Sequence, residues 1–241
     1  MTYCVGLLLD EGMVCLSDTR TNAGLDNIAT YRKMFTFETP GERAIAIMTA
    51  GSLSVTQTTI ARLDEAIHDI DADPESSILM APTMLKVAGI IGRTMAEVAS
   101  DIKEKMEGAA QSARASLIVA GQRKGGPMRM FMIYPEGNFI EATPDTPYLQ
   151  IGEHKYGKPI LDRVVRSETT LADAQKAVLL SMDSTLRSNL SVGMPLDLLV
   201  IEKDACRVGL EKRIEDQDPE FMALSAAWSH ALREAFLAMP G

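Results

Sequence analysis

Thr2 occupies a position at which a threonine can become a nucleophile. A small residue directly after Met1 permits removal of the initiator methionine, which would leave Thr2 with a free α-amine beside its own hydroxyl. A hydroxyl attacks poorly unless a base takes its proton. An α-amine, with an ordinary pKa of about 7.7–8.0, can be that base near neutral pH without a histidine. Taken alone, however, Thr2 is more simply interpreted as the first residue of a strand.

The first apolar segment predicts a hairpin that brings charged residues toward Thr2. Residues 3–18 alternate between two apolar runs with a turn signal near Glu11. If the chain reverses there, the numbers of opposed residues sum to about 22. Thr2 then lies opposite Arg20, and Asp18 is diagonal to Thr2 and within side-chain reach.

A second predicted hairpin adds a lysine and a glycine at the same sheet end. Residues 31–50 form two strand-like runs that turn near Gly41, so opposed residue numbers sum to about 82. Lys33 then lies opposite Thr49, and Gly51 is one step beyond. Both hairpins therefore deliver polar groups to one end of one sheet.

These residues suit amide hydrolysis by an activated hydroxyl. A lysine beside Thr2 lowers the pKa of the hydroxyl electrostatically, and Asp18 can pair with Lys33 and fix it. The backbone N–H of Gly51, where a strand enters a helix, can stabilise an oxyanion. The alternative on spacing alone is a surface salt-bridge network of Asp18, Arg20 and Lys33.

The order of elements predicts an α+β fold with mainly antiparallel sheets inside layers of helices. We expect a single domain over residues 1–241, with a C-terminal helical extension at 217–241, and a polar, turn-rich segment at 19–30. The expected strands are 3–9, 13–18, 31–38, 43–50, 115–121, 128–134, 139–142, 148–152, 196–203 and 206–211. The expected helices are 51–70, 82–105, 154–166, 170–189 and a last one from about Pro219.

Composition excludes several kinds of partner. The 241 residues carry a net charge of −9 and only 5% aromatic residues, which argues against binding to nucleic acid. No basic signal region precedes the first apolar run, and no window is long and apolar enough to cross a membrane. We therefore expect a cytoplasmic protein that binds neither nucleic acid nor membranes.

No motif for a metal, nucleotide or other cofactor is present. The three cysteines and three histidines lack metal-ligand spacing, and no phosphate-binding loop occurs. The sequence predicts no cofactor and fits a reducing compartment. The residues concerned are Cys4, Cys15, Cys206, His68, His154 and His230.

Four short segments in this order resemble a proteasome-type β subunit of the N-terminal nucleophile hydrolase superfamily. They are Thr2 at a strand start, Ser17-Asp18-Thr19-Arg20, Arg32-Lys33-Met34 and Thr49-Ala50-Gly51. Across nearly the whole chain, the sequence is most similar to the bacterial ancestral β-subunit family, Anbu. The segments that carry this second resemblance are 21–28, 151–163 and 187–193.

The resemblance implies a four-layer αββα sandwich and a threonine peptidase or amidohydrolase. It implies Thr2 as nucleophile and, through its amine, as base. It implies that Lys33 tunes the pKa of Thr2 and that Asp18 pairs with Lys33. It also implies that Arg20 supports the arrangement of Asp18 and Lys33. It also implies Gly51 as oxyanion donor and self-assembly into a homo-oligomeric ring or spiral that encloses the active sites and takes a peptide or amide substrate.

The chain departs from the proteasome pattern around the nucleophile's amine. Proteasome subunits carry a serine where Glu153 follows Gly152, and an aspartate where Ser188 follows Arg187. Ser191 keeps the family's serine three residues later. In the family these side chains hydrogen-bond around the amine, so Ser188 removes a charge that would hold an ammonium, and Glu153 could supply one from another direction.

Three functions remain open at this point. The first is a threonine peptidase that acts after Met1 removal. The second is an N-terminal nucleophile amidase on small amides, and the third is a catalytically weak, proteasome-like shell or binding protein. The sequence leaves open the natural substrate, the number of subunits, the choice between ring and spiral, and any separate ATPase partner.

Overall fold

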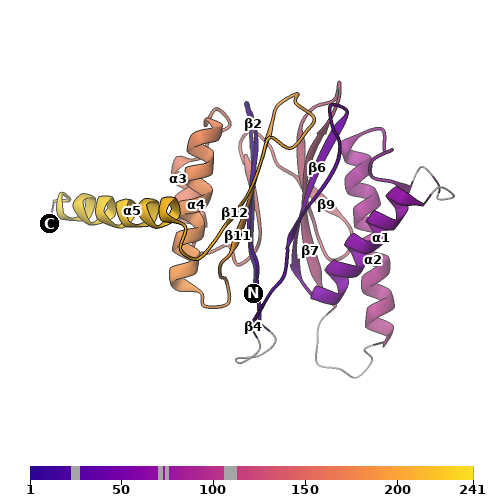
Figure 1. Cartoon of the computed structure of the whole chain (residues 1–241), viewed down its shortest axis with the longest axis horizontal. Coiled ribbons are helices and arrows are strands. Elements are labelled where there is room, and N and C mark those ends of the chain that lie inside the picture. The colour runs from indigo at the N-terminus through magenta and orange to yellow at the C-terminus, as the bar shows by residue number, and fades with distance from the viewer. Residues whose placement is uncertain (23–27, 70–72, 74–75, 106–112, 241) are drawn as a thin grey trace.

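The structure is a computed structural model of the whole chain, and it describes all residues except 23–27, 70–72, 74–75, 106–112 and 241. Two sheets lie face to face between two pairs of helices, which gives the predicted four-layer αββα sandwich (Figure 1). All neighbouring strands within the two large sheets are antiparallel.

The first sheet has β1 and β2 near its centre. Its order is β10 (Tyr148–Gly152), β1 (Tyr3–Leu9), β2 (Gly12–Asp18), β11 (Leu196–Glu202) and β12 (Leu210–Ile214). The second sheet runs β5 (Met34–Thr39), β6 (Arg43–Gly51), β7 (Ala115–Arg123), β8 (Arg129–Ile133) and β9 (Phe139–Glu141). Helices α3 (Lys158–Val164) and α4 (Leu171–Ser188) cover the first sheet, and α1 (Leu53–His68) and α2 (Met84–Lys105) cover the second.

Strand alternation explains the layering. In β1, Tyr3, Val5 and Leu7 pack in the cluster shared with α3 and α4, whereas Cys4 belongs to the cluster between the two sheets. Successive side chains of a strand point to opposite faces, so a strand buried on both faces reads as a continuous apolar run. This burial anchors the strand that begins one residue after Thr2.

Several predicted boundaries were wrong. Residues 19–30, expected as a polar connection, contain the short paired strands β3 (Arg20–Asn22) and β4 (Ile28–Thr30). The strand expected at 206–211 is β12 at Leu210–Ile214. Asp204 and Cys206 have positive φ angles of 64° and 47°, so the turn continues beyond the expected strand start.

The predicted register is wrong in the first hairpin and confirmed in the second. Cys4 pairs with Ser17 and Leu9 with Gly12, so opposed residue numbers sum to 21, and this register brings Tyr3 rather than Cys4 to Asp18. The reason is a tight connection: only two residues separate the paired Leu9 and Gly12, which shifts every pair by one.

In the second hairpin Met34 pairs with Met48, as expected. The N–H of Thr49 donates to the carbonyl of Lys33 at 2.9 Å, which places Lys33 beside Thr49.

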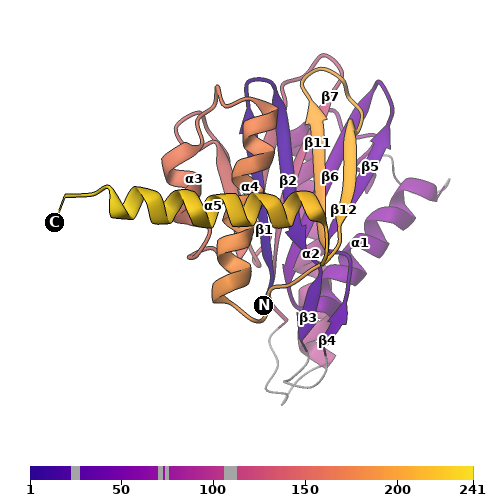
Figure 2. The ribbon, with the colours of Figure 1, turned by 60° about the vertical axis from the view of Figure 1, so that its left-hand side comes forward.

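A fifth helix, α5 (Pro219–Leu237), crosses α4 and projects away from the sandwich (Figures 1 and 2). The Asp218 side chain caps it by accepting from the N–H of Phe221. At its root, Ser225 Oγ donates to Asp183 at 2.7 Å, and Arg187 bonds both residues. No residue of α5 is buried. Among the described residues, no helix combines the length and the apolar character that crossing a membrane would require.

Candidate active site

Asp18 and Lys33 form a buried ion pair between the two hairpins. Lys33 Nζ donates to Asp18 Oδ1 at 2.8 Å and to the carbonyl of Arg20 at 2.5 Å. Asp18 is 0% exposed and Lys33 is 4% exposed. A surface salt-bridge network is therefore the wrong description of this pair. The expectation that both hairpins share one sheet was wrong, because β1 and β2 belong to the first sheet and β5 and β6 to the second, so the pair bridges the two sheets.

The pair depends on its lysine to remain ionic. Burial raises the pKa of the Asp18 carboxyl above its ordinary value, while the Lys33 ammonium and the N–H groups of Tyr3 and Gly193 act in the opposite direction. Tyr3 N–H donates to Asp18 Oδ1 at 3.1 Å and Gly193 N–H to Oδ2 at 3.3 Å. These hydrogen bonds hold the carboxylate in one orientation, so Lys33 Nζ is held as well.

Arg20 contributes its backbone, and not its side chain, to the pair. Its carbonyl accepts from Lys33 Nζ, whereas its guanidinium donates to the carbonyl of Leu190 at 3.0 Å. A Cβ on Gly193 would lie 2.1 Å from Arg20 Nε, so the loop after α4 packs directly against this side chain. Arg20 therefore links the ion pair to the loop at 190–193.

Thr2 lies in the wall of a cavity of about 330 Å³ that also contains Lys33 and Gly51. Met1 lines the same cavity, so its removal would open more space beside Thr2. The carbonyl of Thr2 accepts from the N–H of Glu153 at 2.6 Å, which fixes the chain just before β1. Thr2, Lys33 and Gly51 are thus brought together, as the hairpins predict.

The residues of this site also shift the pKa of the chain's α-amine, which Met1 carries. Burial, and then the charge of Lys33, lower the pKa of this amine below its ordinary value, while Asp18 acts weakly in the opposite direction. Removal of Met1 would place the amine on Thr2, which shares the cavity with Lys33, so we expect burial and the Lys33 charge to act on it as well. Both favour a neutral amine, which is the form that accepts a proton.

Gly51 ends β6 in a conformation that requires glycine. Its φ is +107°, and a Cβ would lie 2.4 Å from the carbonyl oxygen of Arg114. Backbone N–H groups alternate sides along a strand. Because the N–H of Thr49 points to Lys33, we infer that the N–H of Gly51, two residues on, is directed to the same edge of β6, and Gly51 lines the cavity.

The residues expected around the amine are arranged differently from their serine and aspartate counterparts. The Glu153 carboxylate accepts from Asn189 Nδ2 at 3.2 Å and from the N–H of Lys155 at 2.9 Å. Ser191 donates its N–H to Asn189 Oδ1 at 3.0 Å. Ser188, the last residue of α4, is exposed. Within the described residues, no hydrogen bond joins Glu153, Ser188 or Ser191 to a side chain of the cavity.

Sequence reasoning missed the backbone donors and the amide that complete the site. The N–H groups of Tyr3 and Gly193 bind Asp18, and Asn189 ties Glu153 to Ser191. A backbone N–H leaves no signal in side-chain types. Asn189 was visible as a helix end and within the segment 187–193, but the sequence assigned it no contact. Within the part of the chain that the structure describes, no cluster of side chains fits a metal ion.

Comparison with known proteins identifies the family. The family described as proteasome subunit matches residues 2–201. An Anbu (Gly-1) mutant from Hyphomicrobium sp. strain MC1 is 48% identical, with a TM-score of 0.93, and the match covers 100% of this chain and 99% of that one. No curated protein matches the chain.

Two further solved structures are similar over the full length. Anbu (ancestral beta-subunit) from Yersinia bercovieri is 42% identical with a TM-score of 0.93, covering 100% of this chain and 99% of that one. The helical assembly of the Anbu complex from Pseudomonas aeruginosa has a chain 44% identical with a TM-score of 0.93, covering 100% of this chain and 98% of that one. The chain therefore belongs to the proteasome subunit family, in the group of the ancestral β-subunit, Anbu.

Proposed function

We propose that this chain is a threonine-type amidohydrolase or peptidase subunit that acts through Thr2 after removal of Met1. The observation that carries the proposal is the buried Lys33 Nζ, held at 2.8 Å by Asp18 in the wall of the cavity that contains Thr2. A buried lysine fixed by a carboxylate supplies a positive charge where a hydroxyl must lose a proton.

The proposed reaction moves one proton in each half. The Thr2 amine takes the proton of the Thr2 hydroxyl as Oγ bonds to the substrate carbonyl carbon, and the resulting oxyanion is held by the N–H of Gly51. The C–N bond then breaks, and the departing nitrogen receives the proton from the amine. This leaves an ester on Thr2 Oγ, which water hydrolyses with the amine again as base.

The altered residues around the amine are compatible with this role. Glu153 is occupied by Asn189 and Lys155, so its charge is not directed to an ammonium at Thr2. Ser188 carries no charge. Because Lys33 lines the same cavity as Thr2, its charge favours the neutral, proton-accepting form of the amine. The same feature makes the protonated amine a stronger acid toward the leaving nitrogen, and the neutral amine a weaker base toward the Thr2 hydroxyl, which slows the first proton transfer.

Digestion of a peptide library tests the proposal. The chain with Met1 removed should cleave amide bonds, and Thr2→Ala should cleave none. Thr2→Ser should keep activity, because serine retains both the hydroxyl and the α-amine. Cleavage that survives in Thr2→Ala would refute Thr2 as the nucleophile.

The pH dependence of cleavage should report the pKa of the Thr2 amine. An amine acts as base only when neutral, so the rate should rise with pH through the pKa of the Thr2 amine. We expect the midpoint below the ordinary range of about 7.7–8.0, because burial and Lys33 lower the pKa of the Met1 amine in the same cavity and should act on the Thr2 amine in the same direction. In Lys33→Ala the midpoint should move to higher pH. The measurement is the pH profile of kcat/KM, and an unchanged midpoint in Lys33→Ala would contradict this account.

Action on small amides is the second candidate. The cavity of about 330 Å³ holds one side chain or one small molecule, which favours it. Hydrolysis of single-residue amides without cleavage of any peptide would select this candidate. A catalytically weak shell is the third, and it would be selected if Met1 removal produces neither activity.

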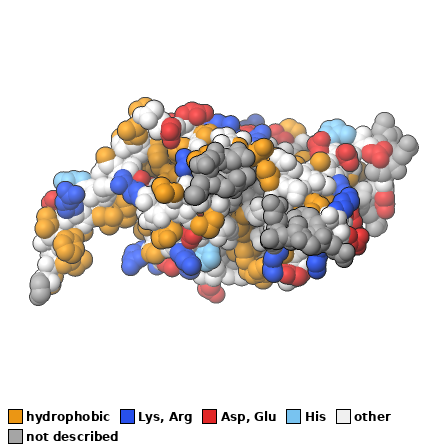
Figure 3. Space-filling view, turned by 90° about the horizontal axis from the view of Figure 1, so that it is seen from below, with side chains coloured by type: hydrophobic (Ala, Val, Ile, Leu, Met, Phe, Trp, Pro, Cys, Tyr) orange, Lys and Arg blue, Asp and Glu red, His pale blue; other side chains and the backbone are white. Residues whose placement is uncertain are grey.

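We propose that the chain works as a homo-oligomer whose contacts include α5, the helical extension of residues 217–241 on the single hydrolase-like domain. A helix that buries none of its 19 residues gains little from its own chain. Its far half exposes large apolar side chains, and Figure 3 shows such side chains along the projecting arm. They are Leu232, Phe236, Leu237 and, just beyond the helix, Met239.

Polar replacement on α5 should therefore disperse the assembly. We expect Phe236→Ser combined with Leu237→Ser to lower the sedimenting mass while changing the unfolding free energy by less than about 0.5 kcal/mol. Ala235→Ser on the same turn is the matched control. An unchanged sedimentation profile in the double variant would exclude α5 as a subunit contact.

We place this activity in the cytoplasm. All three cysteines, Cys4, Cys15 and Cys206, are free and buried, which suits a reducing compartment. Fractionation of cells that express the untagged chain tests this, and recovery outside the cytoplasmic fraction would refute it.

A further inference from the structure

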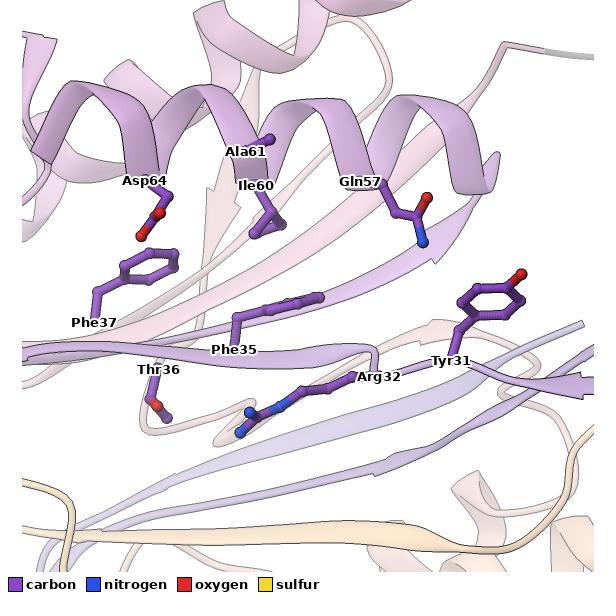
Figure 4. A pocket seen from close by; sticks show the side chains of 9 residues that line it. All are labelled: Tyr31, Arg32, Phe35, Thr36, Phe37, Gln57, Ile60, Ala61 and Asp64. Atoms are coloured by element: carbon purple, nitrogen blue, oxygen red, sulfur yellow. The ribbon is translucent and has the colours of Figure 1, made fainter. Parts of the chain in front are cut away.

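A second cavity lies next to the Thr2 cavity, between the edge strand β5 and helix α1. It has a volume of about 570 Å³ and is shown in Figure 4. The rings of Phe35 and Phe37 point from β5 toward α1, and Ile60 and Asp64 project from α1 toward them. We call this cavity the aromatic groove; Gln57 and Ala61 complete its α1 side, and Tyr31, just ahead of β5, lies on its strand side.

The groove continues the Thr2 cavity along α1 and along the segment that leads into β5. Leu53 lines the Thr2 cavity, and Gln57, Ile60 and Asp64 line the groove. These positions recur at spacings of three and four residues, so they form one stripe along α1. On the strand side, Lys33 lines the Thr2 cavity and Arg32 lines the groove.

The edge position of β5 leaves room for an extended chain. β5 is the outermost strand of its sheet, so among the described residues no strand pairs with its other side. Phe35 and Phe37 are half-buried, and Asp64 is exposed. The groove therefore offers two aromatic rings and one carboxylate beside an open strand edge.

The helix sets the spacing between the two cavities. Leu53 and Ile60 are separated by about 10 Å along α1 at about 1.5 Å per residue. An extended chain covers that distance in about three residues at about 3.3 Å each. Asp64 lies about two residues farther on the same scale.

We infer that the aromatic groove binds the substrate chain about three residues from the bond that Thr2 attacks. It holds an apolar or aromatic side chain against Phe35, Phe37 and Ile60, and a cationic side chain about two residues farther on at Asp64. The inference rests on the proposed function and names its substrate class: an extended peptide, and not a single-residue amide.

Fluorescence anisotropy of a labelled peptide on the Thr2→Ala chain tests binding without cleavage. The probe is a fluorescein-labelled decapeptide of Gly and Ser with one Phe and, two residues on, one Lys. It should bind about tenfold more tightly than the same peptide with Ala in place of Phe. Replacing its Lys by Glu should weaken binding severalfold, and Asp64→Asn should remove that difference.

A filled groove provides the decisive variant. Ala61→Trp adds bulk at the groove and should abolish the preference for Phe. Thr58→Trp adds the same bulk to an exposed position of α1 outside the groove and should leave the preference for Phe unchanged. Equal binding of the Phe and Ala peptides, or a preference that survives Ala61→Trp, would overturn the inference. So would a drop in sedimenting mass in Ala61→Trp, because a second copy would then occupy the groove.

The outcome separates this inference from the proposed function. A Phe preference that Ala61→Trp removes, with no cleavage by the processed chain, refutes the proposed function alone. Cleavage of amides by the processed chain, with no Phe preference in binding, refutes the groove alone.

Discussion

Lys33→Ala is expected to reduce the rate of amide cleavage at least a hundredfold. Lys33 is the buried cation beside Thr2, and its loss removes the charge that favours both the neutral amine and the ionised hydroxyl. Lys33→Arg should not restore the rate, because a planar guanidinium cannot occupy the place of an ammonium held between Asp18 and the Arg20 carbonyl. Steady-state kinetics on the processed chain provide the measurement.

Lys33→Ala should also lower the free energy of unfolding. Removing one partner of a buried pair leaves Asp18 without its counter-charge, which costs about 3–5 kcal/mol of unfolding free energy. Lys124→Ala is the matched control, because Lys124 pairs with Glu42 at 3.0 Å and both side chains are exposed. That variant should cost less than about 1 kcal/mol. If both variants lose the same unfolding free energy in chemical denaturation, the buried Asp18–Lys33 pair contributes no more to stability than the exposed Lys124–Glu42 pair.

Gly51→Ala is expected to lower cleavage by about a hundredfold through its backbone. A Cβ at this position would lie 2.4 Å from the carbonyl oxygen of Arg114 and 2.9 Å from Ala115 Cα, both on main chain that cannot yield. The end of β6 must then shift and move the N–H that faces the cavity. Loss of one oxyanion donor typically costs about 10²–10³ in kcat.

Gly41→Ala separates this effect from ordinary glycine strain. Gly41 also has a positive φ, +80°, but a Cβ there meets nothing within 4 Å. It should cost about 1 kcal/mol of stability and leave kcat unchanged. A normal kcat in Gly51→Ala, or an equal loss in Gly41→Ala, would remove Gly51 from the oxyanion role.

The second hairpin shows how much of the candidate site the local sequence pattern can predict. Turn residues near Gly41 and two apolar runs were enough to place Lys33 beside Thr49, and the structure has that pairing. The first hairpin was predicted one residue out of register, because turn length, and not turn composition, sets the pairing. Asp18 was nevertheless assigned to Lys33, because either register leaves Asp18 at the end of β2, although the prediction put both hairpins in one sheet and the structure puts them in two.

Long-range backbone contacts were beyond prediction. Gly193 binds Asp18 from a loop 175 residues away, and Arg20 turns its guanidinium to Leu190 instead of to Asp18. Neither contact follows from side-chain type or local spacing, since each depends on how the loop after α4 packs on β2. The direction of α5 likewise depends on Ser225 meeting Asp183, which no periodicity encodes.

Intact-mass spectrometry after treatment with a peptide epoxyketone tests the central claim most directly. This reagent needs both the hydroxyl and the free α-amine of one N-terminal residue. We predict a chain that lacks Met1 and carries one reagent on Thr2, with no adduct in Thr2→Ala and a much slower one in Lys33→Ala. A chain that lacks Met1 and forms no adduct, or an adduct on another residue, would contradict Thr2 as the nucleophile.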